Sequence, residues 1–390
     1  MEALPDDVAT PRPVPPSGSA TVPEPRPAGA QAEVPTGVPT GVPTGVPTGV
    51  PTGVPTGVPA NGQTVTIYDV ARRAGVGIAT VSRALRGSAP VADATRAKIL
   101  KVVEELGFRP SHLGTSLAER RHAAAGIVFP DLSGPYYAEV VMGHEEVASS
   151  LGRSVLIQAT HGRPDPEAAA RDLAGRVDGL VLLGRTVPDS LVEEILATGL
   201  PVVLLARPAV GNADSVRIDN STAARQLGAH LGEHGYRSAR FLGSPDLSHD
   251  VAERFAAIAQ GLAPSGTELE LTPCDLNEDA GARVARYVLA ESARPEVLVC
   301  ANDEIALGAI IAAEEAGLRV GVDVAITGWD DIMAARHARP ALTTVRQPMR
   351  LLGAQAAQVL DERIKHRRTT PRHEVLPAEL VVRSSCGPHP

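Results

Sequence analysis

The stretch TIYDVARRAGVGIATVSRAL, residues 66–85, determines how the rest of the chain is interpreted. Thr66 is followed three residues later by Asp69, which matches a capping box and predicts that a helix begins here. Gly75 then marks a turn, and a second helix is expected over residues 78–85. The sequence therefore predicts two short helices folded against each other, with small side chains where they cross.

The outward face of the second helix carries the chemistry of this stretch. The residues expected to face outward are Ile78, Ala79, Ser82, Arg83 and Arg86. In a helix-turn-helix the second helix enters the major groove of DNA, where the two-pronged guanidinium of Arg83 can read guanine. Ile78 and Ala79 suit a thymine methyl, while Thr80 and Ser82 suit phosphates. Spacing alone also allows an ordinary helical hairpin with a solvated arginine face.

The basic module is expected to contain four helices, the first three of them in a DNA-binding domain at residues 63–109. A longer third helix is predicted within residues 91–108, and a short fourth helix over residues 111–121. The apolar positions expected to face the core from the second and third helices are Val81, Leu85, Ile99, Val102, Val103 and Leu106.

The formal net charge of −8 is unevenly spread along the chain. Residues 1–62 carry −3, residues 63–122 carry ten basic and five acidic side chains, and the remainder carries −10. A small basic module joined to a large acidic one suits a polyanion binder attached to a part that does not bind polyanions. Because many solvated helical faces are basic, charge alone supports DNA binding only weakly.

Residues 1–62 form a tail that contains repeats of VPTG from Val34 to Gly57. Proline at every fourth position removes backbone donors, and glycine at every fourth position increases the entropy of the chain, so a packed core is not expected. The tail is interpreted as flexible, and no function is assigned to it.

Beyond residue 123, short apolar runs alternate with amphipathic stretches. Candidate strands lie at 126–130, 154–159, 179–183, 201–205, 238–243, 296–300 and 323–327. Helical stretches lie between them, for example at 135–152, 221–235 and 303–317. Nearly continuous apolar strands separated by helices indicate an α/β fold with parallel sheets covered on both faces. The number of units favours two doubly wound lobes, in which ligands bind at the carboxyl ends of strands.

Four separated segments follow one another in an order typical of a known family. They are residues 66–85, 91–121, 300–331 (CANDEIALGAIIAAEEAGLRVGVDVAITGWDD) and 340–348 (PALTTVRQP). Together they resemble the lactose/galactose repressor (LacI/GalR) family of transcription regulators, over about residues 65–383. The resemblance implies a DNA-binding head, a hinge helix and linker at 110–122, and an effector-binding and dimerisation domain at 123–390 shaped like a two-lobed periplasmic binding protein.

The resemblance also implies roles for residues of the head and hinge. Ile78, Ala79 and Arg83 fall where the family contacts bases in the major groove. Leu117 falls on the leucine that pairs with its symmetry mate and wedges into the minor groove at the centre of the operator, which requires two subunits. A role for Leu117 in packing the helix against the domain stays open.

In the sensor domain, the resemblance places effector contacts on loops between the lobes. The matching positions are Asp131, Tyr136, Arg254, Asn302 and Asp330. Such polar side chains suit a hydroxyl-rich ligand, and Tyr136 or Trp329 can stack on a sugar or purine ring. The sequence equally allows Asn302 and Asp303 to cap the helix that begins there, and Arg254 to be a surface residue.

Three places depart from the family pattern. Gly77 replaces the serine usual at the head of the second helix, which weakens its cap. Gly114 occupies a position that is commonly alanine, so the marginal hinge helix is harder to form. Ala257 and Ile258 replace the usual glycine and phenylalanine after Arg254, which puts the floor of the effector pocket in doubt.

Signals for metal binding and disulfides are weak in the sequence. The three cysteines, Cys274, Cys300 and Cys386, are widely separated, which argues against a disulfide framework and a structural zinc site and fits a reducing compartment. The eleven histidines are scattered. His161, His234 and His337 are therefore treated as ordinary polar residues, and no metal site is predicted.

Signals for catalysis and membrane insertion were also sought. No GxGxxG, GxSxG or GxxxxGK[ST] motif occurs in a fitting context, and HEEVA at 144–148 lacks the second histidine of HExxH. No catalytic residue or cofactor is predicted. The N-terminus lacks the basic start and apolar core of a secretory signal, and no apolar run reaches the roughly 18 residues of a membrane span, so a cytoplasmic protein is expected.

These observations predict a homodimeric transcription regulator, expected to be a repressor. It would bind a palindromic double-stranded operator, with an affinity controlled by a sugar or related metabolite held between two lobes. A solute-binding module of the sugar-receptor type would explain the lobes, but it predicts a signal peptide and no basic head. An α/β enzyme predicts a nucleophile or a cofactor loop that the sequence lacks.

Overall fold

The computed structural model describes residues 65–87, 90–109, 122–366 and 368–388. All of them belong to the second of the two units into which the chain divides, residues 63–390. The predicted tail, the fourth helix of the head and the hinge positions Gly114 and Leu117 lie outside the described residues. Within the described part, no helix combines the length and apolar character needed to cross a bilayer.

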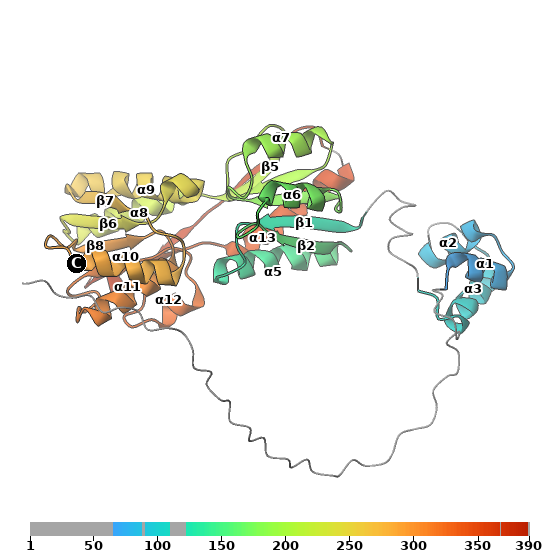
Figure 1. Ribbon diagram of the computed structural model, residues 1–390, viewed down its shortest axis with the longest axis horizontal. Coiled ribbons are helices and arrows are strands. Elements are labelled where there is room, and N and C mark those ends of the chain that lie inside the picture. The colour runs from blue at the N-terminus through green and yellow to red at the C-terminus, as the bar shows by residue number, and fades with distance from the viewer. Residues whose placement is uncertain (1–64, 88–89, 110–121, 367, 389–390) are drawn as a thin grey trace, which may run out of the picture. The chain divides into compact units, whose positions relative to one another are not determined.

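The head contains the three helices α1 (Ile67–Ala74), α2 (Ile78–Arg86) and α3 (Asp93–Glu105) (Figure 1). The Asp69 carboxylate accepts hydrogen bonds from the backbone N–H and the hydroxyl of Thr66 at 3.0 and 2.7 Å, as expected for the acidic residue of a capping box. Gly75 ends α1 with a φ of +67°, a conformation that favours glycine. The shared core consists of Val70, Ala71, Ala74, Val81, Ala84, Ile99, Val102 and Phe108.

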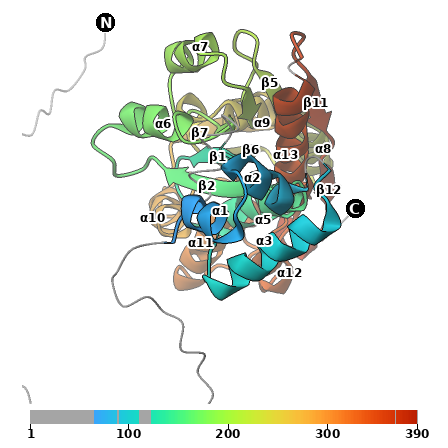
Figure 2. The same ribbon diagram turned by 90° about the vertical axis from the view of Figure 1, so that its right-hand side faces the viewer.

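The N-terminal lobe is built on a six-stranded parallel sheet in the order β11-β5-β4-β3-β1-β2. Its strands are β1 (Ala124–Phe129), β2 (Ser154–Ala159), β3 (Gly179–Leu183), β4 (Val202–Leu205), β5 (Asp214–Ile218) and β11 (His373–Leu376). One face is covered by α5 (Pro135–Ser150) and α13 (Met349–His366), and the other by α6 (Pro166–Ala174) and α7 (Asp189–Ala197) (Figure 1 and Figure 2). The strand order reverses between β1 and β3, which makes a switch point.

The C-terminal lobe has a four-stranded parallel sheet in the order β7-β6-β8-β9. Its strands are β6 (Ser238–Leu242), β7 (Glu268–Thr272), β8 (Val297–Cys300) and β9 (Ala325–Thr327). The helices pair as α8 (Asn220–Glu233) with α9 (His249–Leu262), and α10 (Glu278–Leu289) with α11 (Asp303–Glu315) (Figure 1). The short α12 (Met333–His337) follows β9. The switch point lies between β6 and β8.

Within the described residues, the chain passes between the lobes three times. The first passage links β5 to α8, the second leads from β10 (Thr344–Arg346) to α13, and the third links β11 to β12 (Glu379–Val381). Strands β10 and β12 pair with each other in antiparallel fashion. The described chain then ends beyond the short 3-10 helix η3 (Ser384–Cys386). The two lobes are therefore joined by three connecting segments rather than by a single linker.

Three helix pairs cross with glycine at the contact. A Cβ added to Gly143 of α5 would lie 1.8 Å from the Arg350 carbonyl oxygen, and one added to Gly353 of α13 would lie 1.9 Å from the Val140 carbonyl oxygen. The pairs α8–α9 and α10–α11 repeat this reciprocal arrangement at Gly228 and Gly261, and at Gly281 and Gly308. Backbone packs directly against backbone at all three crossings, so a larger residue would force the helices apart.

All seven predicted strands occur, with bounds within two residues of those expected, and the parallel α/β architecture is confirmed. Strands β5, β7, β10, β11 and β12 were not predicted. One of these strands, β7, reads ELELT and lies at the sheet edge with Glu268 and Glu270 exposed. An edge strand of this kind shows no continuous apolar run, because it is not buried on both faces.

Candidate functional site: the head helix and a buried arginine cluster

Helix α2 exposes the face that the sequence predicts. The side chain of Ile78 is 40% exposed, Ala79 and Arg83 are also exposed, and Thr80 and Ser82 are half-buried. The Arg83 Nε donates a hydrogen bond to the Ala79 carbonyl oxygen at 3.2 Å, which orients the guanidinium along this face. An arginine beside apolar and small side chains is a surface that fits the base edges of the major groove.

The two ends of α2 are held differently. Gly77 precedes the helix and provides no side-chain cap, in agreement with the weak cap predicted from the sequence. At the other end, the Arg96 Nη1 of α3 donates to the Ala84 carbonyl oxygen at 2.9 Å. A cation at a helix C-terminus is favourable because that end carries partial negative charge. Helix α3 thus fixes the C-terminal end of α2.

A second group of predicted residues meets near the carboxyl ends of the C-terminal lobe's strands. Arg254 on α9 is only 5% exposed. Its Nε donates to Asn220 Oδ1 at 2.9 Å, and its Nη1 donates to the Ala301 carbonyl oxygen at 2.8 Å. Its guanidinium carbon lies 4.5 Å from the centroid of the Trp329 ring, a cation–π contact. The alternative that Arg254 is a surface residue is therefore wrong.

Asp330 and Gln347 extend this cluster. Asp330 is buried, has a φ of +125°, which is strained for a residue with a side chain, and accepts a hydrogen bond from the Gln347 amide. Burial raises the pKa of the Asp330 carboxyl well above its usual range, although the Arg254 guanidinium acts in the opposite direction. Within the described residues, Trp329 Nε1 and Gln347 Oε1 have no hydrogen-bond partner. The cluster thus holds one unpaired buried donor and one unpaired buried acceptor.

Tyr136 of α5 connects the N-terminal lobe to this cluster. Its ring packs edge-on against Tyr137, with centroids 5.3 Å apart. Burial raises the pKa of the Tyr136 phenol well above its usual value, and the Asp250 and Asp330 carboxylates raise it further. Tyr136 is therefore within electrostatic reach of both carboxylates, and the fold brings it together with Arg254 and Asp330.

Asp131 lies on the loop between β1 and α5. Its carboxylate accepts hydrogen bonds from the backbone N–H groups of Leu132 at 2.6 Å and Ser133 at 3.0 Å, and the bond from Ser133 is the largest cause of its lowered pKa. A Cβ added to Gly134 would lie 2.6 Å from Glu304 Oε2 of α11. This loop of the N-terminal lobe therefore contacts the C-terminal lobe.

Two parts of the chain match known protein families, and most of the chain is similar to a known regulator. Residues 66–111 match the family described as bacterial regulatory proteins, lacI family, and residues 229–386 match a periplasmic binding protein-like domain. The catabolite control protein A of Priestia megaterium is 33% identical over 303 residues, which cover 76% of this chain and 91% of that protein. The chain belongs to the LacI family. It is therefore a DNA-binding transcriptional regulator.

Other LacI-family members agree with this assignment. The repressor PurR of Erwinia tasmaniensis is 31% identical over 334 residues, 83% of this chain and 98% of that one. A lac repressor dimer bound to its operator and an anti-inducer superimposes with a TM-score of 0.75 at 28% identity, over 84% of this chain and all of that one. A complex of the regulator CelR with cellobiose gives 0.62 at 30% identity, over 82% and 99%. These proteins are regulators, and they support neither the solute-receptor nor the enzyme alternative.

Asn302, another predicted effector residue of this LacI-family chain, follows Ala301 and is the N-cap of α11. Its Oδ1 accepts from the Ile305 N–H at 2.9 Å, and its Nδ2 lies 3.4 Å from the Leu276 carbonyl oxygen. The capping role that the sequence allowed is therefore present. Contact between Asn302 and an effector stays a prediction.

The replaced pocket floor has a packing role. Ala257 and Ile258 are 3% and 1% exposed. A Cβ added to Gly228 of α8 would lie 2.4 Å from the Ile258 carbonyl oxygen. These two residues therefore belong to the core of the C-terminal lobe and the crossing of α8 and α9.

Several polar residues around the lobes were not predicted. Asn220 accepts a hydrogen bond from Arg254, but it lies at the start of α8, outside the segments that resemble the LacI/GalR family. Arg185 of the N-terminal lobe donates to the Asp246 carbonyl oxygen of the C-terminal lobe at 2.6 Å. Burial, together with the charges of Arg185 and Arg207, lowers the pKa of His249. The positions of Arg185 and Arg207 just after β3 and β4 are a signal that could have found them.

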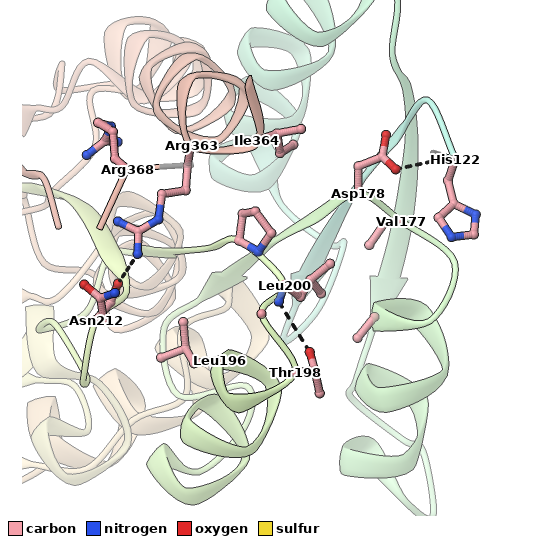
Figure 3. A pocket seen from close by; sticks show the side chains of 13 residues that line it. His122, Val177, Asp178, Leu196, Thr198, Leu200, Asn212, Arg363, Ile364 and Arg368 are labelled. Carbon is pink, nitrogen blue, oxygen red and sulfur yellow. Dashed lines mark hydrogen bonds between the residues drawn. The ribbon is translucent and has the colours of Figure 1, made fainter. Parts of the chain in front are cut away.

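A separate cavity of about 850 Å³ lies in the N-terminal lobe, at the amino ends of the strands of its sheet (Figure 3). Its lining includes Asp178, Arg363 and Arg368. Asp178 accepts from the His122 N–H at 2.6 Å, while Arg363 and Arg368 bind the Asp214 carboxylate at 3.5 and 3.1 Å. These charges therefore pair with the protein itself.

Proposed function

We propose that this LacI-family chain is a repressor that binds a palindromic operator as a homodimer, with α2 in the major groove. The exposed face of α2 is the observation that carries the proposal. Arg83 would read guanine, Ile78 and Ala79 would contact thymine methyl groups, and Thr80 and Ser82 would bind phosphates. The operator complex of the lac repressor dimer supports this arrangement by analogy.

Dimer formation is part of the proposal. Edge strands β2 and β7 expose the apolar residues Ile157 (44%) and Leu271 (41%), and Tyr287 on α10 is 72% exposed. Exposed apolar groups of this kind are suited to burial against a second copy. Leu117 would then meet its symmetry mate in the minor groove, a role that rests on the family resemblance alone.

The DNA-binding proposal is tested with the full chain and DNA from upstream of its own gene. Arg83→Ala should weaken specific binding by about 10- to 100-fold, since one good bidentate base contact contributes roughly 1–3 kcal/mol. Arg237→Ala is the matched control, because it removes the same charge from a 90% exposed side chain of the C-terminal lobe. Equal losses in the two variants would contradict base reading by Arg83.

We further propose that the effector is a sugar or related metabolite held by Tyr136, Arg254, Trp329 and Asp330, with Asp131 and Asn302 at the edges of the site. The unpaired Trp329 Nε1 and Gln347 Oε1 support this, because a hydroxyl-rich ligand can satisfy both a donor and an acceptor. The cellobiose complex of CelR supports the same ligand class.

Effector binding would control DNA affinity through the relative position of the lobes. The groups named above come from both lobes, so a ligand that binds one arrangement more tightly shifts the population toward it. The shift would reach the head through the hinge segment and raise or lower operator affinity by the same coupling free energy.

A thermal-shift screen of sugars, nucleosides and sugar phosphates against the full chain tests the effector proposal. Trp329→Phe removes the Nε1 donor but keeps a buried aromatic ring. It should reduce the ligand-induced rise in Tm more than it reduces the Tm of the ligand-free chain. A hit whose stabilisation is unchanged in Trp329→Phe would contradict the role of Nε1.

A further inference from the structure

Two histidines and a cysteine meet at the end of α8 that lies far from the Arg254 cluster. His230 is in the last turn of α8, and His234 follows one helical turn later, so both side chains project from the same face. Cys386 comes from η3, more than 150 residues further along the chain. The Nε2 atoms of the two histidines are 3.3 Å apart, and Cys386 Sγ lies 3.4 Å from His230 Nε2.

Two of the three separations among these atoms match the edges of a metal coordination tetrahedron. With Zn–N bonds of about 2.05 Å and Zn–S bonds of about 2.3 Å, tetrahedral angles put two nitrogens about 3.3 Å apart and a nitrogen and a sulfur about 3.6 Å apart. The observed distances of 3.3 and 3.4 Å fall close to both values. All three potential ligand atoms lie within 4.8 Å of one another.

Neighbouring groups hold the cysteine in place. The Thr343 hydroxyl donates to Cys386 Sγ at 3.0 Å, and the Tyr236 hydroxyl donates to the Cys386 carbonyl oxygen at 2.7 Å. Tyr236 also stacks on the His234 ring, with centroids 5.6 Å apart and an angle of 9° between the planes. Outer partners of this kind orient metal ligands and tune their basicity.

Burial leaves a route for an ion to enter. Cys386 is fully buried, whereas both histidines are half-buried. The sulfur thus lies at the protein side of the group, and the imidazoles lie between it and the solvent. Three protein ligands with one open side correspond to the pattern in which zinc keeps a fourth position for water.

We propose that His230, His234 and Cys386 form a zinc site that fastens the C-terminal segment of the chain to α8. Two imidazoles and one thiolate form a donor set that suits borderline-soft Zn²⁺ and disfavours Mg²⁺ and Ca²⁺. The site is distinct from the proposed effector site: Asn220, which holds Arg254, begins α8, and His234 follows the last residue of α8, about 20 Å away.

A cobalt titration of the full chain tests the proposal. The chain is freed of metal by a chelator and titrated with Co²⁺, which reports tetrahedral thiolate coordination through d–d bands and a sulfur-to-cobalt charge-transfer band. The wild-type chain should bind one equivalent with both bands, and Zn²⁺ should displace the cobalt. If no charge-transfer band develops in the wild-type chain, the group is a hydrogen-bonded cluster and the proposal is wrong.

Variants identify the ligands. Cys386→Ser should abolish the charge-transfer band, and His234→Ala should weaken Co²⁺ binding by more than about 100-fold, since even the loss of a supporting partner costs about 10- to 100-fold. Cys274→Ser and His337→Ala are the controls and should bind like the wild-type chain. A band that survives Cys386→Ser, or unchanged affinity in His234→Ala, would overturn the assignment. Circular dichroism of each metal-free variant checks that it is folded. The Co²⁺ spectrum of the wild-type chain tests the proposal even if a variant does not fold.

Discussion

The head and the Arg254 cluster both rely on arginine, but in opposite environments. Arg83 lies on an exposed helix face, and its Nε bonds a carbonyl oxygen of its own helix. Arg254 is 5% exposed and binds an asparagine oxygen, a backbone carbonyl and an aromatic ring. DNA would replace water at Arg83, whereas an effector at Arg254 must fit around partners that are already present.

Because of this difference, mutations of the two arginines should affect ligand binding and folding stability in different proportions. An exposed arginine can be removed with little effect on the folded chain, because water solvates what remains. Removal of a buried arginine leaves its hydrogen-bond acceptors and its ion-pair partner without compensation in a region of low polarity. The head should therefore show mutations that change affinity alone, and the cluster should show mutations that change affinity and stability together.

The largest expected effect tests this contrast directly. Arg254→Met should lower the free energy of unfolding by about 3–5 kcal/mol, since Asp250 loses its ion pair and the buried acceptors of Asn220 and Ala301 lose their donor. Arg83→Met should change it by less than about 0.5 kcal/mol. Urea unfolding of the full-length variants gives both values, and similar losses at the two positions would remove the distinction between the regions.

A smaller effect should depend on pH. Burial raises the pKa of Asp250 to about 6, above the value of about 3.9 in an unfolded chain. The stability that this group contributes is therefore complete below about pH 4 and is lost as the pH rises through 6. The asparagine in Asp250→Asn cannot ionise. Above pH 6 the free energy of unfolding of this variant should therefore exceed that of the wild type by up to about 3 kcal/mol more than it does below pH 4.

The check is the Tm difference between Asp250→Asn and the wild type, measured from about pH 5 to about pH 7.5. Asp93→Asn, at an exposed position on the head, provides the comparison. If the difference for position 250 does not grow with pH, the carboxylate is not held in the environment described here.

The smallest expected effect concerns the cap of α2. No atom lies within 4 Å of a Cβ added to Gly77, so Gly77→Ser should fit and supply the missing side-chain cap. A gain of about 0.5 kcal/mol in local stability is expected, with no such gain for Gly77→Ala. Hydrogen exchange of the α2 amides in the full chain measures it. Slower exchange in the alanine variant than in the serine variant would contradict the capping argument.

Sequence reasoning succeeded where one local rule determined the structure. The helices of the head follow from a cap, a glycine turn and apolar spacing within forty residues, and the central strands follow from continuous apolar runs. It failed for strands whose pairing comes from distant segments. Strand β10 has three residues and pairs with β12 more than thirty residues later, so no local pattern identifies it.

The same limit applies to the sites. Family motifs located Arg254, Trp329 and Asp330, but not Asn220, which orients Arg254 from another helix. The sequence also gave no reason to connect His234 with Cys386, because the scattered histidines and cysteines show no metal-binding spacing. Contacts between remote segments depend on how β-strands and helices return to one lobe, which spacing does not encode.

The glycine crossings have a mechanical consequence. Since backbone meets backbone in α5–α13, α8–α9 and α10–α11, no layer of side chains is available there to change rotamer and absorb a displacement. Each lobe should then move as a rigid body, and the bending should be concentrated in the three connecting segments that run between the lobes. Effector binding would then reach the DNA-binding head as a change in the angle between the two lobes, rather than as a local distortion within one lobe.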